Sequence, residues 1–215
     1  MPRRLVSRHF GTILYYGMRA LVVLAIILFL ARRDWIDAVT AGFILVLMLA
    51  PSLLRRHTRL YLPFELELFI VGFTFLTLFL GSLNNFYERI SWWDSLLHFQ
   101  SGILLGFIGF ILVYLLNGGA PKRLTLSPFF LAFFAVCFSM AMSVVWEIYE
   151  FTADSLFGFN MQRSGLVDTM KDLIVNTVGA LVVASAAYGW MLVRRRIPFT
   201  PKRLAGTWYD REQEG

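Results

Sequence analysis

The chain has 215 residues and a formal net charge of +6; 58% of its residues are hydrophobic and only 16% are charged. A soluble domain of this length normally carries about a quarter charged residues, so the composition excludes an ordinary water-soluble globular protein. The basic residues stand in short clusters beside apolar segments, a pattern typical of membrane orientation and contact with anionic lipid, and not of nucleic-acid binding.

Six apolar stretches are long enough to cross about 30 Å of hydrocarbon. The first follows the basic start MPRR and is too long for a signal peptide, so we expect it to be a retained helix. The sequence therefore predicts an all-α membrane protein: a six-transmembrane helical bundle in one domain, residues 1–193, followed by a basic cytoplasmic tail, residues 194–215. The predicted spans lie near 12–31, 36–54, 64–83, 94–116, 128–152 and 169–193.

The distribution of Lys and Arg predicts the orientation. Six spans place both termini and two of the loops on one side, with fourteen basic residues, against four on the other side. Because cytoplasmic loops carry the excess of positive charge, we expect both termini on the cytoplasmic side of the membrane. The fourteen are Arg3, Arg4, Arg8, Arg55, Arg56, Arg59, Lys122, Arg123, Arg194, Arg195, Arg196, Lys202, Arg203 and Arg211; the four are Arg32, Arg33, Arg89 and Arg163.

Several residues along the first four spans have a structural interpretation. Arg19 can snorkel or pair inside the bundle, and Glu67 is expected at the interface at the cytoplasmic end of the third helix. Trp92 and Trp93 fit an aromatic belt at the outer surface. Small residues on the fourth helix, Gly102, Gly106 and Gly109, predict close helix packing, and so do Ala180 and Ala184 on the sixth.

The fourth helix also opens with polar residues, at spacings that stack side chains on one helical face. Asp94 and His98 are four residues apart, and Ser101 follows three further on. Asp94 in the first turn has a structural alternative as a capping residue. His98 lies beyond the first turn and is harder to explain as a cap. Ionisable groups inside a span are by default candidates for function.

Two further polar stretches fall at the same, extracytoplasmic end of the bundle. Glu147 and Glu150 close the fifth helix, near its C-terminus, where the helix dipole disfavours negative charge. Asp168, Asp172 and Asn176 open the sixth helix at intervals of four residues. The three stretches are predicted to converge on one site. Ion pairing with Arg89, Arg163, Lys171 and charged His98 is the alternative, in which the cluster only fastens the helices.

Sets of residues in the second half of the chain resemble known bacterial families. The runs Asn85-Phe86-Tyr87, Trp92-Trp93-Asp94, His98-Phe99, Ser101-Gly102, Trp146 to Glu150 and Gly165 to Asp172 are similar to the YjdF-like inner-membrane family. Glu150, Arg163, Asp172, Asn176 and Gly179 also resemble, more distantly, the VanZ-like pattern, although the Gln that follows its Glu is missing. The resemblance implies an inner-membrane protein with a shared polar site, and no particular reaction.

The leading hypothesis is a metal-dependent hydrolase or transferase acting on a lipid or lipid-linked headgroup. Carboxylates with one imidazole suit Zn²⁺, Mn²⁺ or Fe²⁺, which would acidify a bound water. The candidate metal ligands are Asp94, His98 and Asp172; the candidate catalytic residues are Glu147, Glu150 and Asp168; the candidate substrate-binding residues are Arg163, Ser101 and Asn176. Arg163 would hold an anionic headgroup, and the other two would support the ligands by hydrogen bonds.

Two alternatives from other functional classes remain open at this point. The acidic funnel could bind or transport a cation or an amine-bearing lipid headgroup, which would require polar groups that continue toward the cytoplasmic side. A scaffold, in contrast, would lose stability when Asp172 or Glu147 is neutralised. Membrane lipid is the expected partner in every case, and nucleic acid is not.

Overall fold

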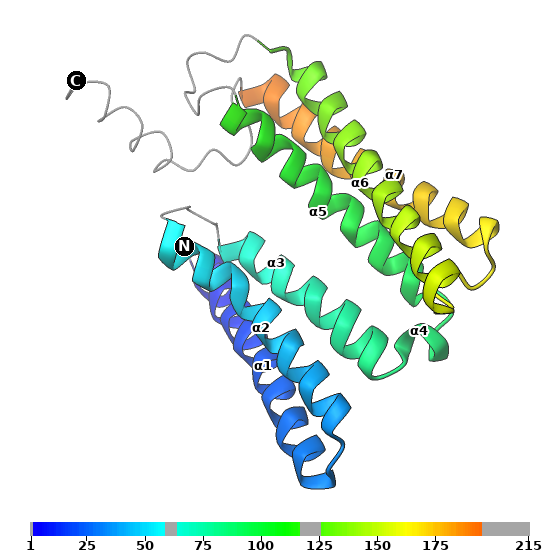
Figure 1. Cartoon of the computed structure of the whole chain (residues 1–215). Coiled ribbons are helices and arrows are strands. Elements are labelled where there is room, and N and C mark those ends of the chain that lie inside the picture. The colour runs from blue at the N-terminus through cyan, green and yellow to red at the C-terminus, as the bar shows by residue number, and fades with distance from the viewer. Residues whose placement is uncertain (1, 59–63, 117–125, 195–215) are drawn as a thin grey trace, which may run out of the picture. The chain divides into compact units, whose positions relative to one another are not determined.

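The computed structural model describes residues 2–58, 64–116 and 126–194, and the side chains of 9–53, 64–113 and 126–193 within them (Figure 1). All regular structure in these ranges is helical, with no strand. The predicted tail beyond Arg194, and most of the two loops used for orientation, lie outside the described residues. The predicted orientation of the termini therefore stays a prediction.

Within the residues that the structure describes, six helices are long and apolar enough to span a membrane, which confirms the six predicted spans. The second helix continues through Pro51. The fifth span ends at Phe157, beyond the predicted residue 152, and the sixth begins at Leu166, before the predicted residue 169. The spans are His9–Arg32, Trp35–Leu53, Phe64–Leu83, Trp93–Val113, Pro128–Phe157 and Leu166–Val193. The fold is thus that of an all-α, multi-pass membrane protein.

The helices form two compact units, Met1–Trp93 and Asp94–Gly215, and each is described by itself. The N-terminal unit contains α1 (Pro2–Arg32), α2 (Trp35–Thr58), α3 (Phe64–Thr74), the π-helix η1 (Phe75–Leu83) and the short α4 (Phe86–Arg89). Its apolar core joins α1, α2, α3 and η1, with Val22, Met48 and Val71 almost fully buried. The prediction of a single domain is not tested by this division.

The third span contains features that the sequence analysis did not anticipate. Its second half is the π-helix η1, and the chain then turns at Asn85, whose φ of 58° is left-handed, into α4. The ring of Trp93 packs edge-on against Phe86 with centroids 5.0 Å apart. Trp93 is therefore 6% exposed, so its predicted place in an aromatic belt is wrong; Trp92 is 57% exposed and keeps that interpretation.

Glu67 belongs to a buried polar cluster in the N-terminal unit, which the sequence analysis did not predict. Its side chain is 1% exposed, whereas its predicted depth at the membrane interface stays a prediction. The hydroxyls of Tyr15 and Ser52 donate hydrogen bonds to Glu67 Oε1. Arg19 donates to Ser52 Oγ and to the Met48 carbonyl, and its guanidinium lies 4.0 Å from the centre of the Tyr15 ring. Of the two alternatives predicted for Arg19, the structure thus shows pairing inside the bundle and not snorkelling.

The C-terminal unit consists of α5 (Trp93–Leu116), α6 (Pro128–Phe157) and α7 (Leu166–Arg194). The hydroxyl of Ser127 caps the start of α6, and Gly158, with a left-handed φ of 67°, ends it. A Cβ atom on Gly102 would collide with the Asn176 carbonyl, and one on Gly106 would press on Val183. The small residues therefore let α5 approach α7 backbone to backbone, as the sequence predicted.

Candidate functional site

The first turns of α5 present Asp94 and His98 on one face of the helix. Asp94 lies in the first turn, where the helix dipole favours a negative charge. Four residues later the His98 side chain, which is buried, returns to the same face, with its Nε2 atom 3.6 Å from Asp94 Oδ1. The predicted pairing of these two residues is present in the structure.

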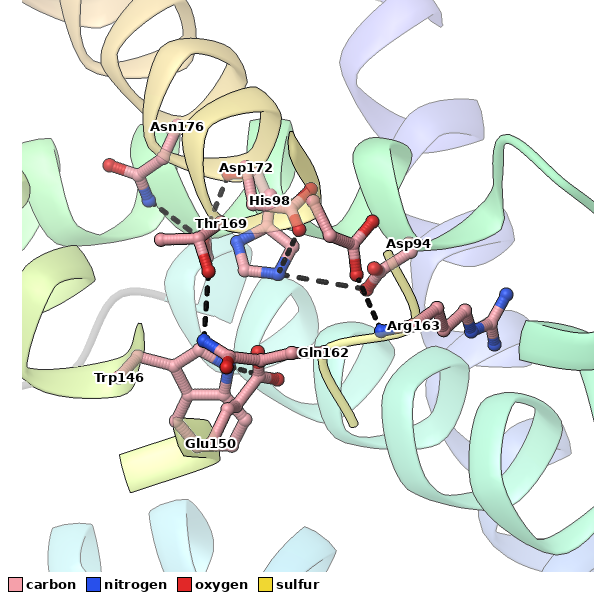
Figure 2. Close-up of polar contacts among 11 residues, drawn as sticks. Asp94, His98, Trp146, Glu150, Gln162, Arg163, Thr169, Asp172 and Asn176 are labelled. Atoms are coloured by element: carbon pink, nitrogen blue, oxygen red, sulfur yellow. Dashed lines mark hydrogen bonds and ion pairs between the residues drawn. The ribbon is translucent and has the colours of Figure 1, made fainter. Parts of the chain in front are cut away.

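The third member of the group comes from α7. Asp172 is 1% exposed, and its Oδ2 lies 3.9 Å from the same Nε2 of His98 (Figure 2). One ligand atom from each of Asp94, His98 and Asp172 lies within 4.8 Å of the other two, so the group could hold a metal ion. Asp172 Oδ1 is buried without a hydrogen-bond partner among the described residues.

A hydrogen-bond network directly beneath the group holds the three helices of the unit in register. The Asn176 amide donates through Nδ2 to Ser101 Oγ on α5, at 2.9 Å, and accepts through Oδ1 from Ser139 on α6, at 3.1 Å. Ser101 in turn donates to the His98 carbonyl. Asn176 thus fixes His98 and Asp172 relative to one another, because it lies one turn from Asp172 on the same face of α7.

The interior face of α6 adds two buried carboxylates, Glu147 and Glu150. The indole N–H of Trp146 donates to Glu150 Oε1 at 2.8 Å. Glu147 lies beside Gln162 and Thr169, but neither of its oxygens forms a hydrogen bond of standard geometry within the described residues. The helix runs to Phe157, so the predicted position of these carboxylates close to its C-terminus is wrong; burial, and not the dipole, is their main cost.

The connection from α6 to α7 is held by side chains of both helices. The carboxylate of Asp154 accepts hydrogen bonds from the backbone N–H groups of Met161 and Gln162, both at 2.8 Å. Asp168 accepts from the Arg163 N–H at 3.2 Å, and Gln162 Nε2 donates to Thr169 Oγ1 at 2.8 Å. The Arg163 side chain is exposed and lies within electrostatic range of Asp94.

The structure brings all nine sequence-predicted site residues to the same end of the three helices of the C-terminal unit. Their predicted roles are untested. Ser101 and Asn176 are engaged with one another and with Ser139, an arrangement that suits support of the site better than contact with a substrate. The sequence analysis missed Ser139, Trp146, Asp154, Gln162 and Thr169. The spacing of Ser139, Ser143, Glu147 and Glu150 on α6, at intervals of four, four and three, could have revealed the polar stripe.

Below Asn176 and Ser139 the interior of the unit becomes apolar. A core cluster that includes Phe110, Leu131, Ala135 and Ala187 fills the space between the helices. No ionisable side chain belongs to that cluster, as far as the described residues go. Among the described residues of this unit, the buried polar side chains do not continue past Ser139 and Asn176, which disfavours a transport path through these three helices.

Comparison with known proteins places the chain among membrane proteins. The model of a family described as predicted membrane protein, DUF2238, matches residues 13–195. An uncharacterized protein of Thermotoga maritima is 30% identical over 144 residues, which are 65% of this chain and 70% of the relative. No solved structure matches. These matches agree with the YjdF-like resemblance, whereas the VanZ-like resemblance stays a prediction.

Proposed function

The chain belongs to the DUF2238 family of predicted membrane proteins, and we propose that it is a membrane-embedded metalloenzyme that hydrolyses or transfers the headgroup of a lipid. The observation that carries the proposal is the convergence of Asp94, His98 and Asp172, one ligand atom each within 4.8 Å. Two carboxylates and one imidazole form a donor set that suits Zn²⁺, Mn²⁺ or Fe²⁺.

The cost of burial supports a bound cation in this group. A carboxylate that is 1% exposed, as in Asp172, is expensive to hold in a helical bundle unless it is paired or ligates a metal. Its Oδ1 has no hydrogen-bond partner among the described residues, and its Oδ2 is 3.9 Å from the imidazole nitrogen. That separation is beyond a hydrogen bond, so both atoms would be available as metal ligands.

The depth of the group favours a lipid headgroup as substrate. Asp94 is the second residue of its span and Asp172 the seventh of its own. At about 1.5 Å per residue, the ligands lie within roughly 10 Å of the ends of the helices, where headgroups meet hydrocarbon. The exposed Arg163, which lies in the connection between α6 and α7, would pair with the phosphate of such a headgroup.

Asp94, His98 and Asp172 would hold the metal, which would supply an acidified water as nucleophile for hydrolysis of a phosphodiester. The new bond joins the water oxygen to phosphorus, and the bond between phosphorus and the leaving oxygen breaks. One proton of the water passes to a buried carboxylate, for which Glu147, Glu150 and Asp168 are the candidates, and the leaving oxygen takes up a proton. In a transferase, an alcohol takes the place of the water.

The proposal includes the orientation predicted from the basic residues. Both termini would lie in the cytoplasm, and the site would open at the outer leaflet of a bacterial inner membrane. Fusions of a periplasm-dependent enzyme and of a fluorescent protein to the C-terminus test this orientation. Fluorescence without enzyme activity is the expected result; the converse would place the site at the inner leaflet.

The first experiment measures metal content by mass spectrometry on the full chain purified in detergent. We expect about one metal ion per chain or more in the wild type, and a loss of metal in Asp94→Asn, His98→Ala and Asp172→Asn. Glu88→Gln, which changes an exposed carboxylate of the N-terminal unit, is the matched control. Wild-type protein without metal, even after supplementation, would overturn the proposal.

The second experiment separates catalysis from binding. Metal-loaded protein in liposomes of bacterial phospholipid should release phosphorus-containing or alcohol headgroup fragments, and the His98→Ala variant should not. Headgroup binding without release would indicate a cation- or lipid-binding protein. Two results together would argue against an enzyme. The variants would fold well without metal, and the wild-type protein would leave the lipid composition unchanged.

A further inference from the structure

The carboxylates at this end of the C-terminal unit outnumber the two negative charges that a single divalent ion can neutralise. Asp94, Asp168, Asp172, Glu147 and Glu150 are buried or half-buried, against one imidazole. The neighbouring Lys171 and Arg163 have exposed side chains. One divalent ion at the Asp94–His98–Asp172 group would neutralise two of these charges, while Arg163 and Lys171 lie within electrostatic range of Asp94.

Glu147 is the carboxylate that most requires a partner. It is 5% exposed, and neither of its oxygens is hydrogen-bonded within the described residues. Its side chain is buried beside Gln162 and Thr169, within electrostatic range of Asp94, Asp168 and Glu150. Buried polar groups normally have a partner, and a bound cation is one that two carboxylate oxygens can share.

Glu150 is oriented toward the same space by a neighbouring side chain. It lies three residues after Glu147, on the same face of α6. The Trp146 indole N–H donates a hydrogen bond of 2.8 Å to Oε1, which leaves Oε2 for another contact. Figure 2 draws the two side chains. Carboxylates that bind metals are commonly fixed in this way by a second hydrogen bond. One turn deeper, the buried hydroxyl of Ser143 also has no hydrogen-bond partner among the described residues.

We propose that Glu147 and Glu150 bind a second divalent cation beside the one at Asp94, His98 and Asp172. This inference rests on the proposed function, which it extends to a two-metal site. All the donors available to the second ion are oxygens, which favour a hard cation such as Mg²⁺ or Mn²⁺ over Zn²⁺. Two-metal sites stabilise both the attacking and the leaving oxygen in phosphoryl chemistry. Asp168 is then the remaining buried carboxylate that can receive the proton of the water.

The test is the stoichiometry of Mn²⁺ binding to the full chain in detergent, stripped of metal and titrated while free Mn²⁺ is followed by electron paramagnetic resonance. We expect about two Mn²⁺ ions per chain for the wild type and about one for Glu147→Gln and for Glu150→Gln. Glu88→Gln should bind as the wild type does. Size-exclusion chromatography and helical circular dichroism identify any variant that does not fold.

Trp146→Phe provides a second variant, which keeps an aromatic ring and removes only the indole donor. It should weaken one of the two sites about 10- to 100-fold and leave the other unchanged. Trp92→Phe, at an exposed tryptophan, is its control.

The outcomes separate this inference from the proposed function. One Mn²⁺ in the wild type, retained in Glu147→Gln and lost in Asp172→Asn, would overturn the second site and leave the proposed function standing. Two ions in both the wild type and Glu147→Gln would overturn the assignment of the ligands. No bound Mn²⁺, Zn²⁺ or Fe²⁺ in the wild type would overturn both proposals.

Discussion

Gly102 on α5 lies directly against the backbone carbonyl of Asn176 on α7, without room for a Cβ atom between them. A second contact of the same kind joins Gly179 on α7 to the Phe99 carbonyl on α5. His98 lies about one turn before Gly102 on α5, and Asp172 lies about one turn before Asn176 on α7. The packing of the two glycines therefore sets the distance between the candidate metal ligands.

We expect Gly102→Ala and Gly179→Ala to destabilise the C-terminal unit, because the added methyl group must push the two backbones apart. Overpacking of this kind costs about 1–3 kcal/mol. The free energy of unfolding in a mixed detergent series measures the effect. The same variants should bind metal more weakly, since the ligands on α5 and α7 move apart.

Gly189→Ala is the matched control on the same helix. A Cβ atom at this position would meet nothing within 4 Å, so the change should be neutral or slightly stabilising. Equal losses of stability at Gly189 and Gly179 would show that the intrinsic effect of the substitution, and not the close approach of α5 and α7, is responsible.

We expect the hydrogen bond from Ser139 to Asn176 to stabilise the unit, and to appear as a coupling free energy between the two side chains. Hydrogen bonds between membrane helices average about 0.6 kcal/mol in double-mutant cycles and reach about 1.7 kcal/mol. The cycle of Asn176→Ala, Ser139→Ala and the double variant measures this coupling directly. A coupling of zero, with both single variants folded, would mean that the 3.1 Å contact contributes nothing.

A metal ion that binds the folded chain should also raise its thermal stability. At a concentration one hundred times Kd, binding to the native state alone contributes about 2.7 kcal/mol. We therefore expect Mn²⁺ to raise the Tm of the wild type and of Glu88→Gln, and to leave the Tm of Asp172→Asn much less affected. An equal shift in Asp172→Asn would indicate binding elsewhere on the chain.

Hydrophobic length and the spacing of polar residues made much of the fold predictable from the sequence. Apolar runs define all six spans, because a helix is the only way to satisfy the backbone inside lipid without a closed barrel. Spacings of three and four residues correctly grouped Asp94 with His98 and Asp172 with Asn176. These patterns do not indicate which faces of different helices pack against one another.

The features that the sequence analysis missed depend on such tertiary contacts. Glu67 is close to the start of its helix, where an interfacial position is a natural prediction, and only packing against Tyr15 and Ser52 buries it. Trp93 is adjacent to the exposed Trp92, yet the turn at Asn85 brings Phe86 against it. Nothing in the local sequence distinguishes Ser139 from other serines in membrane helices, because its partner Asn176 belongs to a different helix.

Glu67 provides a prediction that separates stability from the candidate site. Removing its carboxylate in Glu67→Ala leaves the hydroxyls of Tyr15 and Ser52 without their acceptor inside the N-terminal unit. Hydrogen bonds to a charged group contribute about 1.5–3 kcal/mol, so the free energy of unfolding should fall by an amount of that order. Tyr15→Phe should cost less, because Ser52 still donates to Glu67.

Metal content is the complementary measurement on the same variants. All the candidate ligands belong to the C-terminal unit, so folded Glu67→Ala protein should retain the metal of the wild type. Glu65→Gln, at an exposed carboxylate two residues away, should change neither stability nor metal content. A loss of metal in folded Glu67→Ala would show that the N-terminal unit contributes to metal binding, and would require the ligand set proposed here to be extended.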